Sequence, residues 1–189
     1  MKNCQVLMNQ NYKLANLSSN AYRIKEMGDG FLCSVGFPFR LPQDTSMEQS
    51  AYQLALDFIQ IFQEQVLAHF SHNEYFCSIG IARGSIEGYF PKSGIKEYDL
   101  FGEGIIHATR YENMRKKIVM DSPQRNILIL QESVYIGLSE LDRSEFHTLE
   151  LTKNGLVVRD DPTAAKLYYR FISTSFEENP GISNSQLAV

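Results

Sequence analysis

The longest regular pattern of hydrophobic positions in the chain lies between Ser46 and Phe70. Hydrophobic residues recur there at steps of three and four, which is the spacing of one face of an α-helix. They are Ala51, Leu54, Ala55, Phe58, Ile61, Phe62 and Val66. Ser46 followed by Gln49 has the S-x-x-Q pattern of a helix-capping box. The sequence therefore predicts a long amphipathic helix from Ser46 to Phe70 that packs on a sheet.

A period-two pattern precedes this helix. Hydrophobic and charged residues alternate over residues 22–25, and residues 31–35 form a mostly apolar return strand. Between them, Gly28-Asp29-Gly30 has the composition of a tight turn, so we expect a β-hairpin that exposes the Asp29 carboxylate at its tip. With Lys25 four residues earlier, that carboxylate suits a hard cation and its phosphates. Asp-Gly is also an ordinary hairpin turn, and the motif alone leaves both interpretations open.

The remaining patterns predict shorter elements. A helix is expected within residues 1–20 and another from Gly102, with a short helix over 132–138. Strands are expected over 75–81, in a short segment that ends at Tyr89-Phe90, and over 98–101, 126–130, 146–151, 156–159 and 166–172. Asn154-Gly155 is expected to form a hairpin turn between two of the last strands. This order predicts an α+β fold with helices on one face of an antiparallel or mixed sheet. We expect one domain over residues 1–172 and a flexible tail over 173–189.

Charge and cysteine content narrow the class of protein. A net charge of −4, with no basic cluster beyond Arg115-Lys116-Lys117, gives no nucleic-acid footprint. The three cysteines, Cys4, Cys33 and Cys77, lack metal-ligand spacing and are expected to be buried reduced thiols. No apolar run approaches the roughly twenty residues of a membrane span. We therefore expect a cytoplasmic protein without a membrane segment.

Three segments together resemble a known family. They are Ile24–Gly30 with Val35–Pro38, then Ser78–Gly88, then Tyr98–Arg110. In this order they resemble the signature segments of the class III nucleotidyl cyclases, the adenylate and guanylate cyclases, over about residues 12–172. The resemblance implies a ferredoxin-like core with a C-terminal extension. It also implies a head-to-tail homodimer, or a heterodimer, with active sites at the interface.

The resemblance also implies roles for four residues. Asp29 matches one of the aspartates that bind Mg²⁺ or Mn²⁺ in those enzymes, and Arg110 matches their transition-state arginine. Lys25 and Asp99 match the pair that recognises adenine, so ATP is the implied substrate and cyclic AMP the product. Taken singly, Lys25 could be a solvated strand lysine, Asp99 a turn-capping residue and Arg110 a helix-end residue.

Two departures from the family pattern leave the activity open. The family carries a second metal-binding aspartate on a strand before the first helix, and we expect this chain to begin too late to contain it. Ile106 replaces the asparagine that orients the ribose, and isoleucine cannot form that hydrogen bond. The neighbouring His107 is expected to be a surface or packing residue. The sequence thus supports an adenylate cyclase domain or, alternatively, a catalytically impaired regulatory, nucleotide-binding or dimerisation module.

Overall fold

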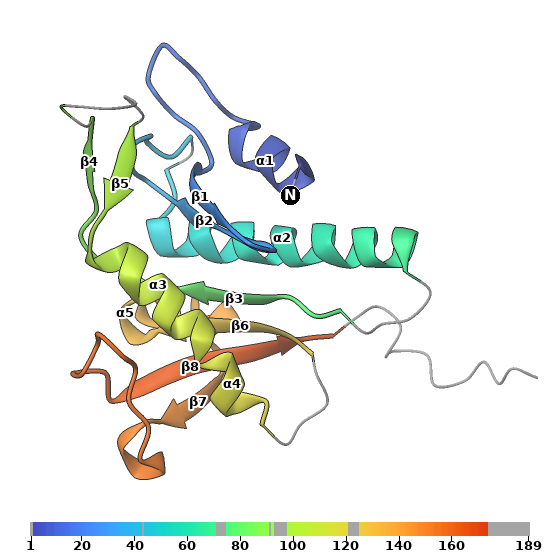
Figure 1. The fold of residues 1–189 in the computed structure, drawn as a ribbon, viewed down its shortest axis with the longest axis vertical. Helices are drawn as coiled ribbons and strands as arrows, with labels where there is room; N and C mark the ends of the chain where they lie inside the picture. The colour runs from blue at the N-terminus through green and yellow to red at the C-terminus, as the bar shows by residue number, and fades with distance from the viewer. Residues whose placement is uncertain are drawn as a thin grey trace, which may run out of the picture.

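The computed structural model describes residues 2–42, 44–70, 75–90, 92, 98–120 and 125–173 (Figure 1). Its helices and strands follow in this order: α1 (Lys2–Asn9), β1 (Tyr22–Met27), β2 (Gly30–Ser34), α2 (Met47–His69), β3 (Ser78–Ile81), β4 (Glu87–Tyr89), β5 (Asp99–Phe101), α3 (Glu103–Asn113), α4 (Arg115–Ile118), β6 (Asn126–Gln131), α5 (Glu132–Ile136), α6 (Glu140–Arg143), β7 (His147–Glu150), the 3₁₀-helix η1 (Thr152–Asn154) and β8 (Lys166–Ile172). The tail predicted over 173–189 lies outside the described residues except for Ser173.

The strands form one sheet of four and two separate hairpins. The sheet has the order β3-β6-β8-β7, in which β3 and β6 are parallel and the other neighbours antiparallel. The hairpins are β1-β2 and β4-β5. Among the described residues, β3 pairs only with β6 and β2 only with β1, so each of these strands has an outer edge. The predicted α+β class is therefore confirmed.

Strand β6 shows how the sheet is covered. Its residues Asn126–Leu130 are all buried. Leu128 and Leu130 pack with Tyr52 and Ala55 of α2, whereas Ile127 and Ile129 pack with Tyr111 of α3 and with Met114, the residue that follows this helix. Because successive strand residues point to opposite faces, α2 and α3 cover opposite faces of this sheet. The expected arrangement with helices on one face is wrong for the four-stranded sheet, since the hydrophobic run of β6 has two faces to bury.

Helix α2 is the predicted long helix, and its start confirms half of the predicted capping box. The Ser46 hydroxyl accepts a hydrogen bond from the Gln49 backbone amide at 3.0 Å. The Gln49 side chain does not return to Ser46. It donates to the Asp142 carboxylate at 2.8 Å and accepts from the Ser139 amide at 3.2 Å. Gln49 therefore ties the start of α2 to the N-terminus of α6.

Helix α3 packs against β3 at backbone distance. A Cβ atom on Gly80 would lie 2.4 Å from the Glu112 amide nitrogen and 2.5 Å from the Ala108 carbonyl oxygen. At the start of α3, Gly102 has a φ of +140°. A Cβ there would lie 2.3 Å from the Ser85 carbonyl oxygen. Glycine in these motifs thus fixes the position of the helix that carries Arg110.

The segment between β7 and β8 differs from the prediction. Leu156–Arg159 is not a strand, and Asn154-Gly155 is not a hairpin turn between strands. Asn154 ends η1, and Gly155 follows with a φ of +63°. Val158 is completely buried but forms only an isolated bridge with Asp161.

The N-terminal helix ends at Asn9. Within the described residues, no helix is long and apolar enough to cross a bilayer.

Candidate functional site

The β1-β2 hairpin presents Lys25 and Asp29 as the alternating pattern predicts. Met27 pairs with Gly30 across a turn in which Gly28 has a φ of +63°. Glycine adopts such a φ without steric cost, so Gly28 favours this turn. The side chains of Lys25 and Asp29 are both exposed, Asp29 at the hairpin tip. The tip therefore offers a carboxylate to a ligand in solvent.

Asp99 lies at the start of β5, opposite Tyr89 of β4. One carboxylate oxygen, Oδ1, accepts a hydrogen bond from the Leu100 amide at 2.9 Å. Asp99 is itself exposed, while Leu100 is buried beneath the β4-β5 hairpin. The local hydrogen bond uses one oxygen and leaves Oδ2 as an acceptor at the surface.

Arg110 lies near the end of α3 with its side chain 29% exposed. Its Nε donates to Oδ2 of Asp160 at 2.6 Å, and this carboxylate is 42% exposed. Arg159 also approaches the same oxygen, at 3.8 Å. The sequence prediction of Arg110 did not include Asp160, which lies fifty positions further along the chain and outside the three signature segments.

A buried polar network lies directly below this ion pair. The Tyr111 hydroxyl donates to Oδ2 of Asp161 at 2.9 Å, and the Gln131 amide nitrogen donates to the same oxygen at 3.2 Å. Burial and the hydrogen bond to Asp161 raise the pKa of Tyr111 far above its usual range. The phenol therefore stays protonated and acts as a donor.

His107 joins the network and the ion pair. It is buried, and its Nε2 lies 3.0 Å from the Asp160 carbonyl oxygen. A carbonyl can only accept, so Nε2 carries the proton, and Nδ1 accepts from the Gln131 amide at 3.5 Å. Of the two roles expected for His107, a surface residue or a packing residue, the structure shows the second, and both ring nitrogens have hydrogen-bond partners. Asp160 and Asp161 were not among the predicted site residues. The composition Asp160-Asp161-Pro162 is typical of a turn, but no local pattern links it to α3.

The four candidate residues are not bonded to one another within the described chain. No hydrogen bond or ion pair joins any two of Lys25, Asp29, Asp99 and Arg110 in the described part of the chain. The same residues contain no group of three or more histidine, cysteine, aspartate or glutamate side chains that could hold a metal. One exposed carboxylate still fits a cation of the magnesium type, which keeps several waters and is bound through one or two carboxylates plus substrate phosphates.

The cysteines do not offer a second kind of metal site. Burial raises the pKa of the Cys33 and Cys77 thiols to about 12, and all three cysteines are free. Because the thiolate is the metal ligand and the nucleophile, thiols that stay protonated at neutral pH are inert. All three are free thiols, as predicted, but only Cys4 is fully buried, whereas Cys33 and Cys77 are half-buried.

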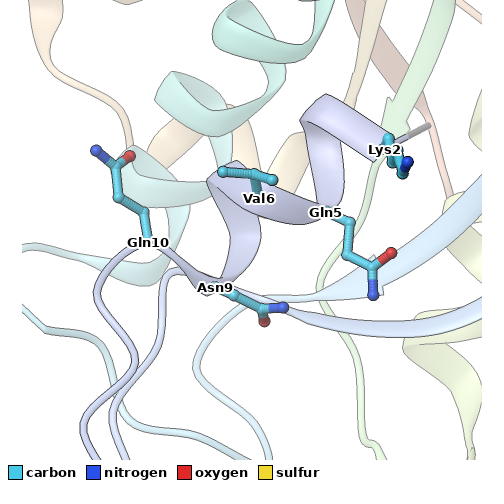
Figure 2. A pocket seen from close by; sticks show the side chains of 5 residues that line it. All are labelled: Lys2, Gln5, Val6, Asn9 and Gln10. Atoms are coloured by element: carbon cyan, nitrogen blue, oxygen red, sulfur yellow. The ribbon is translucent and has the colours of Figure 1, made fainter.

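A surface hollow on α1 lies apart from these residues. Figure 2 shows its lining, Lys2, Gln5, Val6, Asn9 and Gln10, all from α1 and the residue after it. Its side chains are mostly amides, and Val6 is 69% exposed. None of the four candidate residues contributes to this hollow.

The mixed sheet and the exposed carboxylate on the hairpin are consistent with a domain of the nucleotidyl cyclase class. The family model described as "Adenylate and Guanylate cyclase catalytic domain" matches residues 2–149. The chain therefore belongs to the family of adenylate and guanylate cyclase catalytic domains, which confirms the resemblance of its three signature segments. No solved structure matches the chain.

Proposed function

We propose that the chain is an adenylate cyclase domain that converts ATP to 3′,5′-cyclic AMP and pyrophosphate. The observation that carries this proposal is the family match over residues 2–149, within which Lys25 and Asp99 lie exposed on two different hairpins. Their side chains can bind a ligand without rearrangement of the core.

Lys25 and Asp99 support adenine as the base. An ammonium group only donates hydrogen bonds, and a carboxylate only accepts them. Adenine offers a ring-nitrogen acceptor to the first and an exocyclic amino donor to the second. Guanine presents the opposite pattern, so its binding leaves polar groups unpaired, which a buried site penalises strongly. The hydrogen bond from Leu100 leaves Oδ2 of Asp99 for the amino group.

Asp29 and Arg110 are suited to act at the phosphates and the ribose 3′-hydroxyl of the nucleotide, where the reaction takes place. Asp29 would hold Mg²⁺ or Mn²⁺, and the bound cation supplies charge neutralisation at the phosphates and activation of the ribose 3′-hydroxyl. The guanidinium of Arg110 is planar and permanently charged, and it stabilises the charge that develops on the α-phosphate. Because no hydrogen bond or ion pair joins these residues to Lys25 or Asp99 in the described part of the chain, and because the family resemblance implies active sites at an interface, we propose that the site forms between two chains, in a homodimer or a heterodimer.

A second function is favoured by Ile106. This side chain is 45% exposed on α3, one helical turn before Arg110. An exposed isoleucine at the position where the family orients the ribose supports a domain that binds nucleotide or dimerises without efficient turnover. We keep this regulatory module as the alternative proposal.

Titration of the protein with ATP and with GTP, together with an assay for cyclic AMP, tests the proposal. We expect tighter binding of ATP, a loss of that preference in Lys25→Ala and Asp99→Asn, and no change in Lys153→Ala, which removes an exposed lysine elsewhere. Equal affinity of the wild-type protein for ATP and GTP would contradict the adenine assignment. ATP-selective binding without cyclic AMP formation would support the regulatory module instead.

A further inference from the structure

In the ion pair between Arg110 and Asp160, the backbone of Asp160 is fixed and the side chain of Arg110 is the flexible partner. Asp160 has a φ of +66°, a conformation that aspartate tolerates better than most residues. Its turn is closed by a hydrogen bond from the Asp161 amide to the Val158 carbonyl at 3.1 Å. Val158 is completely buried and Asp161 is 8% exposed. The backbone on both sides of Asp160 is therefore anchored in the core.

Helix α3 holds this turn through two further residues. His107 donates to the Asp160 carbonyl, and Tyr111 donates to the Asp161 carboxylate. Gln131 adds a third contact and is itself oriented, because its Oε1 accepts from the Arg83 amide at 2.8 Å. Since moving the turn breaks the buried hydrogen bond from Tyr111 and the part-buried ones from His107 and Gln131, the Asp160 carboxylate sets the position of the long, flexible arginine side chain.

The contact uses one edge of the guanidinium. Only Nε of Arg110 reaches Asp160, and its two terminal nitrogens have no hydrogen-bond acceptor among the described residues. A guanidinium held at Nε keeps its two terminal amino groups for a planar, bidentate contact with a phosphate.

Arg159 places a second exposed guanidinium beside this contact. Its Nε lies 3.8 Å from the same carboxylate oxygen, and its side chain is 80% exposed. The Asp160 and Asp161 carboxylates balance the charges of Arg110 and Arg159, so the attraction for a phosphate depends on the terminal nitrogens of Arg110 rather than on a net positive charge.

We propose that Asp160 is a positioning residue that fixes the guanidinium of Arg110 so that its terminal amino groups bind a nucleotide phosphate. This inference rests on the role of Arg110 in the proposed function. It adds a residue from outside the matched segment 2–149 to the site.

Two variants separate orientation from charge. Asp160→Asn keeps a side-chain oxygen acceptor and tolerates the positive φ, whereas Asp160→Gly tolerates the φ but has no acceptor. Both remove the same negative charge, so any difference between them reports the hydrogen bond to Arg110. Arg159→Ala is the matched control, since it removes the exposed guanidinium 3.8 Å from the same carboxylate oxygen and keeps the 2.6 Å contact of Arg110.

The first readout is binding of inorganic tripolyphosphate by calorimetry, together with the ¹⁵N-detected exchange of the Arg110 Nε proton. We expect slow exchange in the wild type, Arg159→Ala and Asp160→Asn, and fast exchange in Asp160→Gly. We expect Asp160→Asn to bind tripolyphosphate several-fold more tightly than Asp160→Gly. Equal affinities of the two variants would overturn the proposal, because a purely structural Asp160 would change unfolding but not this ratio.

The second readout is the turnover of ATP. A side chain misplaced by about 1 Å can cost on the order of a hundredfold in rate, so we expect kcat to fall in Asp160→Gly far more than KM rises, with recovery in Asp160→Asn. If both variants exceed the wild-type kcat, Asp160 restrains Arg110 and the proposal is wrong. If the wild type forms no cyclic nucleotide, the proposed function fails, while the tripolyphosphate comparison still decides whether Asp160 positions Arg110.

Discussion

The contact between β3 and α3 predicts that Gly80→Ala destabilises the protein and displaces Arg110. A Cβ atom at residue 80 would lie 2.4 Å from the Glu112 amide nitrogen, whereas ordinary contact begins at 3.4 Å. The obstacle is helix backbone and cannot rotate away, so α3 must move outward by about 1 Å. Overpacking of this kind costs typically 1–3 kcal/mol, and we expect a loss of about 2 kcal/mol.

The unfolding midpoint measures this effect. For a domain of this size, about 2 kcal/mol lowers Tm by roughly 4–8 °C, and urea titration should give the same loss with an unchanged m-value. Gly30→Ala is the matched control, because its Cβ would lie 3.7 Å from the nearest atom, the Met27 carbonyl oxygen. An unchanged midpoint in Gly80→Ala would mean that β3 and α3 are not in backbone contact.

Displacement of α3 also has a functional consequence. Arg110 lies between Ala108 and Glu112, the two residues that the added methyl group would push. If Arg110 contacts the nucleotide phosphates, a shift of about 1 Å lowers turnover by up to about a hundredfold. Loss of stability with full activity per folded molecule would refute this coupling and leave the packing argument intact.

Three further predictions address the shared site, the buried ionisable groups and the helix cap. The variants Lys25→Ala and Asp29→Ala should each be inactive alone and should recover part of the cyclase activity when mixed, because a mixed dimer has one intact site. No recovery in confirmed mixed dimers would refute a two-chain site. Folding raises the pKa of Cys33 to about 12 and also raises that of Tyr111, so the unfolded chain releases these protons at lower pH than the folded chain does, which lowers stability at alkaline pH. The urea midpoint should therefore be constant below about pH 8 and fall progressively above about pH 9. A constant midpoint up to about pH 11 would contradict burial of these groups. Ser46→Ala should cost about 1 kcal/mol by removing the hydrogen bond to the Gln49 amide, and a change below about 0.3 kcal/mol in chemical unfolding would show that the cap contributes little.

The sequence predicted elements whose evidence is local. Helix α2 has a hydrophobic stripe and a capping serine, and the β1-β2 hairpin has an alternating pattern and a glycine turn, so both formed where expected. The segment 156–159, Leu-Val-Val-Arg, has the composition of a strand, but the positive φ of Asp160 and the following Pro162 end it before a strand can pair. Local composition therefore predicted a strand where the chain forms a turn that buries Val158.

The candidate site was predicted only in part because its residues depend on contacts distant in sequence. The exposure of Lys25 and Asp29 follows from the hairpin pattern. The partner of Arg110 does not, because only the packing of α3 against β6 and the turn at Val158–Asp161 brings Asp160 within 2.6 Å. The burial of both faces of β6 could have been inferred, since Ile127–Leu130 is apolar without alternation and such runs are typical of strands covered on both sides.

The edges of the sheets determine where two copies of the chain would first adhere. The strands β1 and β7 carry charges, Arg23, Lys25 and Glu26 on the first and Glu150 on the second. The strands β2 and β3, GFLCS and SIGI, carry none. Charged residues oppose the pairing of edge strands between molecules, and uncharged apolar edges promote it. Non-native aggregation in concentrated solutions should therefore begin at β2 and β3, where backbone amides rather than side chains would form the new contacts.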